Sequence, residues 1–263
     1  MIPQPGPIVN GSRLDKATIM DRIRLDQALV NKKLVRTRSQ AEGYIKLGTV
    51  MVNDHIVSKP GRLIWPQDII QLTITEHYVS RGALKLDSVT DRLKLDFHNK
   101  VVLDVGSSTG GFSEYSLRHG AKKVIAIDVG KDQLHASLRD HPRIELHEKT
   151  DIRKISQLSE LVDLVLVDVS FISVRPILSH ISKLVQPKTI VIAMVKPQFE
   201  VKSDLKHKGV VKNDSLRRDI LHKFEIWAQS YGWFIEAKAD STVVGAKGNQ
   251  ERFYRLKRDP KRI

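Results

Sequence analysis

A glycine-rich stretch in the middle of the chain has the residue types of a ligand-binding turn. Residues 101–105 are apolar apart from one acid, three glycines follow within residues 106–111, and apolar positions resume at Phe112. This spacing predicts a buried strand, a tight turn and a helix start, the first unit of a nucleotide-type α/β fold. The glycines allow the backbone to approach a ligand, and the helix N-terminus offers N–H groups to a carboxylate or phosphate. The spacing differs from the dinucleotide pattern G-x-G-x-x-G, and the phosphate-loop pattern G-x-x-x-x-G-K-[ST] is missing.

Acidic residues lie at the ends of apolar runs, both within this stretch and further along the chain. Asp104, Asp128 and Asp168 each lie at the end of such a run, and Asp151 comes shortly after another. Ligands bind at the carboxyl ends of strands in an open parallel sheet, so these acids are expected to share one edge. Asp128 follows the glycines at the spacing of an acid that binds ribose hydroxyls, and Asp151 could meet an adenine amino group. Together they favour a cofactor that contains adenosine.

One lysine closes a strand that is otherwise almost wholly apolar. Pro197 must end that strand directly after Lys196, so the lysine is expected at the ligand edge of the sheet. Two further stretches with polar residues accompany predicted strands, Val167–Phe171 at the end of one strand and Gly248–Glu251 before the last one.

A dense group of basic residues lies near the N-terminus, on or between two predicted helices. Such side chains can follow a phosphate backbone, with contacts that position a nucleic acid without reading its sequence. The residues expected to bind nucleic acid in this way are Arg22, Arg24, Lys32, Lys33, Arg36, Arg38 and Lys46.

The elements that position these residues fall into two domains. Apolar periodicity predicts one helix around residues 25–29 and another around 41–47, the second opened by a capping box of Ser39 and Glu42, followed by short strands. From Arg81 onward a helix and then alternating strands and helices predict an α/β domain with a mostly parallel sheet. We expect a tail at 1–20, a small α+β domain at 21–76, a linker at 77–80 and the large domain at 81–263. The expected strands of the large domain after the glycine turn are Val124–Asp128, Ile144–His147, Val162–Asp168, Thr189–Lys196, Phe234–Ala237 and Phe253–Leu256, and Arg255–Ile263 is expected to be a frayed basic tail.

Composition narrows the class of protein. The 263 residues carry a formal net charge of +14, which favours polyanionic partners such as nucleic acid. The absence of cysteine excludes disulfides, thiolate zinc sites and a cysteine nucleophile. The N-terminus lacks a signal-peptide pattern, and no apolar run approaches the length that spans a bilayer, so we expect a cytoplasmic protein without membrane contact.

Two resemblances join these observations. An acid before the first glycine is similar to the S-adenosylmethionine loop of class I methyltransferases. The pattern Arg-Leu-Asp at 24–26, Ser39-Gln-Ala, Ile45-Lys-Leu-Gly-Thr-Val, Val52-Asn-Asp, Lys59-Pro and Asp68-Ile-Ile resembles the RNA-binding domain first described in ribosomal protein S-four. With Arg81–Lys85 and the stretches around Asp168, Lys196 and Glu251, residues 22 to 257 resemble the TlyA-type ribosomal RNA 2′-O-methyltransferases, relatives of FtsJ that are often labelled haemolysins.

The resemblance implies a Rossmann-like class I methyltransferase domain after the small α+β RNA-binding domain. It implies S-adenosylmethionine as cofactor and methylation of a ribose, a cytidine, in ribosomal RNA or ribosomal subunits. Carried over motif by motif, the catalytic tetrad is Lys85, Asp168, Lys196 and Glu251. The cofactor residues are Asp104, Gly106, Ser107, Ser108, Thr109, Gly110, Gly111, Phe112, Asp128 and Asp151. The chain departs from the family in the extension before Arg22 and in the short segment after Leu256. Some family members carry a longer C-terminal helix that is associated with a wider choice of ribosomal sites, and its absence puts activity on both subunits in doubt.

The tetrad suggests a mechanism that needs no metal. A ribose hydroxyl is a poor nucleophile, and a free lysine is mostly protonated at neutral pH and cannot accept its proton. We hypothesise that neutral Lys196 is the base, that Lys85 positions the 2′-oxygen, and that the two acids hold the lysines.

Three alternatives stay open at this point. A non-catalytic RNA-binding or ribosome-assembly protein would bind RNA without the cofactor. A haemolysin would need an apolar or amphipathic membrane segment, of which the sequence gives no convincing example. An RNA-modifying enzyme of another chemistry, such as a pseudouridine synthase, would not need the glycine turn or the acids at the strand ends.

Overall fold

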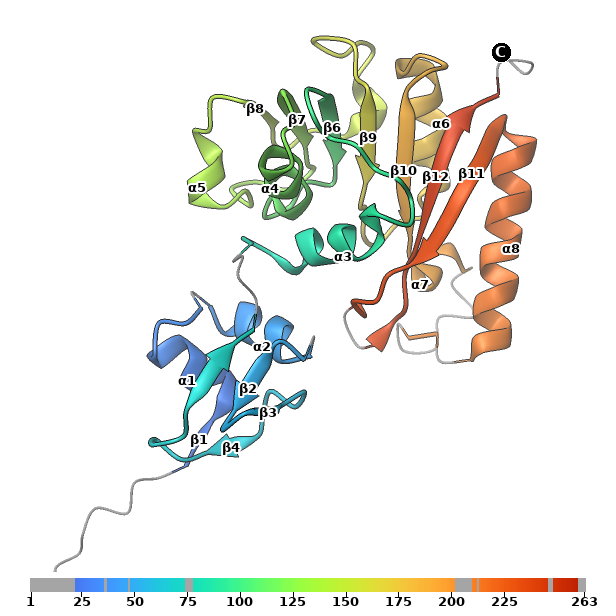
Figure 1. Ribbon diagram of the computed structural model, residues 1–263. Coiled ribbons are helices and arrows are strands. Elements are labelled where there is room, and N and C mark those ends of the chain that lie inside the picture. Colours follow the sequence, from blue (N-terminus) through green and yellow to red (C-terminus); the bar gives the residue numbers. More distant parts are fainter. Residues whose placement is uncertain are drawn as a thin grey trace, which may run out of the picture. The chain divides into compact units, whose positions relative to one another are not determined.

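The computed structural model (Figure 1) describes residues 22–35, 37–46, 48–73, 78–201, 210–211, 213–245 and 248–259, without the side chain of Ser39. The predicted tail at 1–20 and the basic residue Arg36 therefore lie outside the described residues. The chain divides into a small unit up to Thr75 and a large unit from Glu76.

The small unit packs two short helices against short antiparallel strands. Of the apolar positions expected on the helices, Leu25, Leu29, Ala41 and Ile45 are fully buried. Strand β1 pairs with β4, and β2 lies between β3 and β5 in a second sheet. The elements are β1 (Ile23–Arg24), α1 (Leu25–Asn31), α2 (Arg38–Lys46), β2 (Val50–Val52), β3 (His55–Ile56), β4 (Leu63–Ile64) and β5 (Ile70–Leu72).

The predicted start of the second helix was wrong by two residues. Helix α2 begins at Arg38, which places Ser39 inside its first turn. The hydroxyl of Thr37 accepts a hydrogen bond from the backbone N–H of Gln40 at 3.1 Å and so caps the helix instead. Both hydroxyl residues satisfy the cap pattern in sequence, and the helix begins at the earlier one.

The large unit alternates strands and helices, as the sequence predicted. The elements are α3 (Arg81–Thr90), β6 (Val101–Val105), α4 (Gly111–Arg118), β7 (Lys123–Ile127), α5 (Ala136–Arg139), β8 (Ile144–His147), the 3-10 turn η1 (Ile152–Lys154), β9 (Leu164–Val167), α6 (Arg175–Leu184), β10 (Ile190–Val195), α7 (Pro197–Glu200), α8 (Asp214–Ser230), β11 (Trp233–Asp240) and β12 (Arg252–Arg258). Strand β12 includes residues 255–258, so the prediction of a frayed tail from Arg255 was wrong for these four residues.

These strands form one seven-stranded sheet in the order β11-β12-β10-β9-β6-β7-β8. Strands β6 to β10 are mutually parallel, and β12 runs antiparallel to both of its neighbours. From β6 the chain moves outward through β7 and β8 and then returns to β9 on the other side of β6. This reversal between β6 and β9 is the topological switch point, outside which α/β sheets bind ligands.

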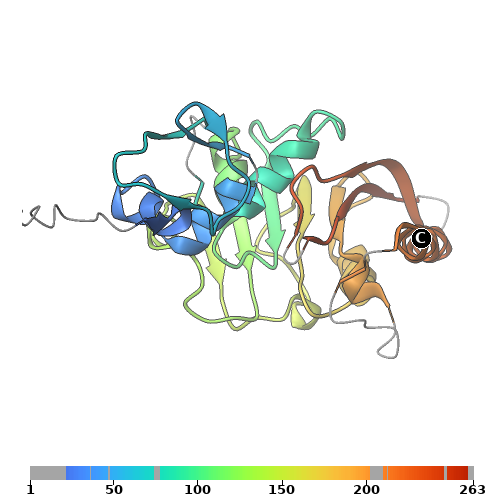
Figure 2. The ribbon, with the colours of Figure 1, turned by 90° about the horizontal axis from the view of Figure 1, so that it is seen from below.

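The alternation of side chains along the strands builds a core on each face of the sheet. On one face, Val165 and Ala193 pack with residues of α6 and α8. On the other face, Leu166 and Ile192 pack with residues of α3 and α4. Figures 1 and 2 show α8 running beside β11 at one edge of the sheet.

The segment expected to link the domains is in part built into the large unit. Tyr78 is only 6% exposed and packs among the residues of α3 and α4. The backbone N–H of Val79 donates to the carboxylate of Glu114 at 2.5 Å, and the hydroxyl of Ser80 caps α3. Residues 78–80 therefore anchor the start of the large unit.

Candidate active site

The glycine turn brings the end of β6 against the end of β9. Gly106 and Gly110 have φ angles of +85° and +93°, which side chains rarely tolerate. A Cβ atom at Gly106 would lie 2.5 Å from the carbonyl oxygen of Asp168. Only glycine at this position lets the turn and Asp168 form one continuous wall.

A cavity of about 440 Å³ opens at this edge of the sheet. Its walls are the ends of β6, β7 and β9 and the segments that follow them. Five of the predicted site residues line it: Gly106, Ser108, Asp128, Asp151 and Asp168. Apolar walls come from residues such as Ile127, Val129, Ile152 and Ile172. The remaining predicted loop residues, Asp104, Ser107, Thr109, Gly110, Gly111 and Phe112, are not part of the cavity lining.

Asp104 lies beneath the turn instead of facing the cavity. It is 1% exposed, and its Oδ2 atom accepts a hydrogen bond from Ser113 at 2.6 Å, whereas Oδ1 is buried without a partner among the described residues. Burial raises the pKa of this carboxyl to about 7. Asp104 thus joins β6 to the first turn of α4 and fixes the turn from behind.

The two acids proposed to bind an adenosine group lie on the cavity wall. Asp128 accepts backbone N–H groups from Ser108 at 2.8 Å and Gly130 at 2.6 Å, which ties the end of β7 to the glycine turn. Asp151 forms an ion pair with Arg153 at 2.6 Å. Hydrogen bonding from Arg153 lowers the pKa of Asp151 to about 2, so this carboxylate is ionised at neutral pH. Asp128 retains lone pairs for a ligand hydroxyl, whereas both oxygens of Asp151 already accept hydrogen bonds from Arg153.

The four predicted tetrad residues form two ion pairs. Nζ of Lys85 is 2.6 Å from Oε2 of Glu251, and Nζ of Lys196 is 2.5 Å from Oδ1 of Asp168. Glu251 and Lys196 are buried, with side chains 3% and 8% exposed. Pairs this well desolvated keep their side chains in defined positions.

The sheet topology brings the two pairs to the same edge. Val195 pairs with Arg252 across the antiparallel strands β10 and β12, so Lys196 and Glu251 are the next cross-strand neighbours. Asp168 follows β9, the parallel neighbour of β10, and also lines the cavity. Lys85 reaches Glu251 from α3. The pairs therefore gather at the carboxyl ends of β9 and β10, next to the cavity.

Sequence reasoning did not assign two side chains that contact Lys196 or a third that packs against one of them. Nζ of Lys196 donates to Oγ of Ser170 at 2.7 Å and lies 5.9 Å from the ring centroid of Phe199. The Phe199 ring contacts that of Phe171, with 5.4 Å between centroids. Phe171 is 87% exposed and has a left-handed φ of +68°. The stretch Val167–Phe171 was noted in the sequence, but contact between its serine and Lys196 depends on the pairing of β9 with β10.

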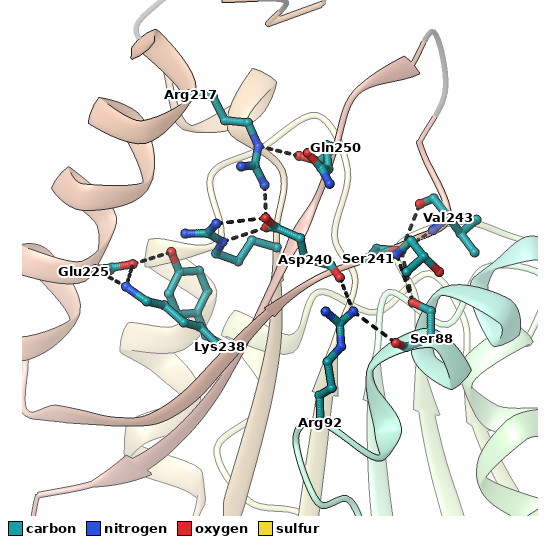
Figure 3. Close-up of polar contacts among 12 residues, drawn as sticks. Ser88, Arg92, Arg217, Glu225, Lys238, Asp240, Ser241, Val243 and Gln250 are labelled. Atoms are coloured by element: carbon teal, nitrogen blue, oxygen red, sulfur yellow. Dashed lines mark hydrogen bonds and ion pairs between the residues drawn. The ribbon is translucent and has the colours of Figure 1, made fainter. Parts of the chain in front are cut away.

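A polar network holds the segment that carries Glu251 (Figure 3). Asp240, the last residue of β11, accepts hydrogen bonds from Arg217 of α8 at 2.5 Å and from Arg252 of β12 at 2.7 Å. Arg217 also donates to the carbonyl of Gln250 at 3.2 Å, next to Glu251.

The opposite side of this segment is held by α3 and by Arg92, which follows it. Arg92 donates to the carbonyl of Asp240 at 2.6 Å, and the hydroxyls of Ser88 and Ser241 are 3.4 Å apart. The backbone N–H of Ser241 donates to the carbonyl of Glu251 at 3.0 Å. Glu251 is thus fixed from two helices as well as from its own strand.

The basic residues of the small unit are arranged around a buried acid. Asp26 is fully buried and forms ion pairs with Arg24 at 2.8 Å and Arg38 at 2.9 Å, whose side chains are 43% and 55% exposed. Hydrogen bonds from Arg24, which has the largest effect, and from Arg38 lower the pKa of Asp26 to about 2. The other predicted RNA-binding residues that the structure describes have different surroundings. Arg22 lies 4.2 Å over the ring of Trp65, and Lys32 donates to the carbonyl of Asp68 at 3.1 Å. Lys46 pairs with Glu42 at 3.4 Å, and Lys33 is exposed.

Comparison with known proteins gives matches to both units. The model of the family described as FtsJ-like methyltransferase matches residues 78–258, and that described as S4 domain matches residues 23–70. The chain is 40% identical over 183 residues to the 23S rRNA (cytidine-2′-O)-methyltransferase TlyA of Campylobacter jejuni, which covers 69% of this chain and 71% of the relative. It is 35% identical over 243 residues to the 16S/23S rRNA (cytidine-2′-O)-methyltransferase TlyA of Mycobacterium tuberculosis, with 90% of each chain covered.

A solved hemolysin-like structure from Streptococcus thermophilus is also similar, with 32% identity and a TM-score of 0.70 over 92% of this chain and 90% of that chain. Among the helices that the structure describes, none has the length and apolar character required to cross a membrane.

Proposed function

Because the chain belongs to the FtsJ-like methyltransferase family, with an S4 domain ahead of the methyltransferase domain, we propose that it methylates a ribose 2′-oxygen in ribosomal RNA, on a cytidine, with S-adenosylmethionine as methyl donor. Ribosomal RNA or a ribosomal subunit is then its partner, and the reaction takes place in the cytoplasm. The observation that carries the proposal is the gathering of the Lys85–Glu251 and Lys196–Asp168 pairs beside the cavity.

The cavity residues fit an adenosine-containing cofactor. Gly106 lets the turn lie against the backbone of Asp168, with which a Cβ atom would collide, so both segments form one wall of the cavity. Asp128 offers carboxylate oxygens to ribose hydroxyls, and the apolar wall residues suit the faces of a purine. Asp151 would accept from the adenine amino group in place of part of its bonding to Arg153. S-adenosylmethionine supplies an electrophilic methyl group when it is bound.

The two lysines divide the work on the target hydroxyl. In this proposal Nζ of Lys196, as the neutral amine, accepts the proton of the 2′-hydroxyl, and the oxygen becomes the nucleophile. Lys85 donates a hydrogen bond that positions this oxygen. Asp168 and Glu251 hold the two amines and balance the positive charge that Lys196 gains with the proton. General-base action of this kind contributes about 10²–10⁴-fold, in addition to the effect of alignment.

The small domain supplies RNA affinity. Arg24 and Arg38 present half-exposed guanidinium groups that Asp26 holds in one geometry, and guanidinium groups bind phosphate oxygens well. Contacts of this kind position an RNA backbone, and the methyltransferase domain then selects the ribose.

The test uses methyl-labelled S-adenosylmethionine and unmodified ribosomal subunits. We compare the wild type with Lys196→Met and with the control Lys123→Met, which removes a lysine paired to Glu145 and Glu160 at the start of β7, outside the site. Label on a cytidine 2′-oxygen with the wild type and the control, and not with Lys196→Met, supports the proposal. Label on a base, or near-normal turnover by Lys196→Met, contradicts it. Tight subunit binding without cofactor binding or label favours an assembly protein.

A further inference from the structure

Ser170 connects the proposed base to the cofactor cavity. It lies two residues after Asp168, on the segment between β9 and α6, and it lines the cavity. Its Oγ atom accepts a hydrogen bond from Nζ of Lys196 at 2.7 Å, while Oδ1 of Asp168 lies 2.5 Å from the same nitrogen. Lys196 therefore has a hydrogen-bond acceptor, Ser170, and an ion-pair partner, Asp168, on one short segment, although Oδ1 of Asp168 itself accepts no hydrogen bond among the described residues.

These two neighbours define the direction of the lone pair of a neutral amine. Such an amine has two N–H groups and one lone pair around Nζ. The negative charge of Asp168 repels a lone pair, so with Asp168 alone the lone pair can occupy either of the two positions that face away from the carboxylate. With Ser170 accepting an N–H at one of these positions, only one position remains, and the lone pair must occupy it.

The backbone around Ser170 is held in place from both sides. Phe171 has the left-handed φ of +68°, which turns the chain directly after Ser170. Glu200 of α7 accepts hydrogen bonds from the backbone N–H of Val174 and the hydroxyl of Ser173, both at 2.8 Å. Since α7 starts directly after Lys196, the segments that carry the serine and the lysine are joined a second time.

We propose that Ser170 is a positioning residue for methyl transfer: it fixes Nζ of Lys196 so that the lone pair faces the target hydroxyl. The inference rests on the proposed function, in which Lys196 is the base. It adds a fifth residue to the four that the sequence pattern indicates, one that acts through Lys196.

The experiment measures the single-turnover rate constant at saturating S-adenosylmethionine and RNA, with the two dissociation constants measured separately. Ser170→Ala is expected to lower the rate constant about 10- to 100-fold, because slight misplacement of a catalytic group costs up to that much. Both dissociation constants should stay within about twofold, since the interaction matters in the transition state and not in binding. Ser170→Thr keeps the hydroxyl and should restore most of the rate. The control Ser179→Ala removes a serine hydroxyl of α6 that bonds to Tyr231, away from the cavity lining, and should keep the wild-type rate.

A wild-type rate constant in Ser170→Ala would overturn the inference. So would a loss that disappears at saturating cofactor, because Ser170 would then be a cofactor contact only. If Ser170→Thr were as slow as Ser170→Ala, the hydroxyl would not be the active feature. Failure of the proposed function gives a different result, since the wild type itself would then place no methyl group on a 2′-oxygen.

Discussion

The Lys85–Glu251 pair allows stability and catalysis to be separated by substitution. Glu251→Gln keeps the shape of the side chain and removes its charge, which leaves the ammonium group of Lys85, only 12% exposed, without a counter-charge. Removing one partner of a buried pair costs about 3–5 kcal/mol, and the low end applies here because the amide oxygen can still accept one hydrogen bond. A loss of about 3 kcal/mol lowers the Tm of a domain of this size by about 6–12 °C.

The double variant Lys85→Met/Glu251→Gln removes both charges and is expected to regain a large part of this loss. Urea and thermal unfolding of the wild type, both single variants and the double variant give the coupling free energy of the pair. We expect the double variant to be more stable than Glu251→Gln and yet inactive in methyl transfer, since both groups that handle the hydroxyl are changed. Strict additivity of the single effects, or activity in the double variant, would refute the reasoning.

Three further predictions concern other parts of the molecule. In the folded chain Asp104 keeps its proton up to about pH 7, whereas in the unfolded chain the carboxyl loses its proton above about pH 4. Its contribution to the free energy of unfolding is therefore full at low pH and is lost as the pH rises from about 4 to about 7. Urea unfolding of Asp104→Asn should lack this decline, and a pH profile equal to that of the wild type would contradict a buried neutral acid. A Cβ atom at Gly245 would lie 2.5 Å from Oε1 of Glu251, so Gly245→Ala should displace this carboxylate and reduce methyl transfer. Full activity of this variant would show that the carboxylate can move without cost. The double variant Arg24→Ala/Arg38→Ala should weaken binding to RNA of any sequence. It should also reduce the slope of the logarithm of the RNA association constant against the logarithm of salt concentration by about 2, as measured by filter binding. An unchanged slope would show that these arginines do not contact the RNA.

The strands and the glycine turn could be predicted because local patterns determine them. Apolar runs closed by acids identified the carboxyl ends of β6, β7 and β9, and Pro197 placed Lys196 at the end of β10. The cavity lies at the topological switch point between β6 and β9, where ligands are expected to bind in an open α/β sheet.

The contacts between distant segments could not be predicted from the same patterns. Glu251 neighbours Lys196 because β12 enters the sheet antiparallel beside β10, and strand order is not encoded in any single strand. Contact between Lys196 and Ser170 depends on the pairing of β9 with β10, and the need for glycine at 245 depends on where the Glu251 side chain lies. The cap at Thr37 shows the limit at short range, since two hydroxyl residues satisfied one pattern.

Phe171 has a consequence for how this protein evolves and is engineered. A large aromatic side chain that is 87% exposed gains little from burial, and a left-handed backbone costs a residue other than glycine about 1–3 kcal/mol. Folding alone would favour glycine at this position, so Phe171→Gly should raise the Tm, and a lower Tm would show that the strain is compensated within the segment. Selection for heat resistance alone would therefore replace Phe171 early. When a thermostable variant carries a substitution at residue 171, its methyl-transfer rate should be compared with that of the wild type.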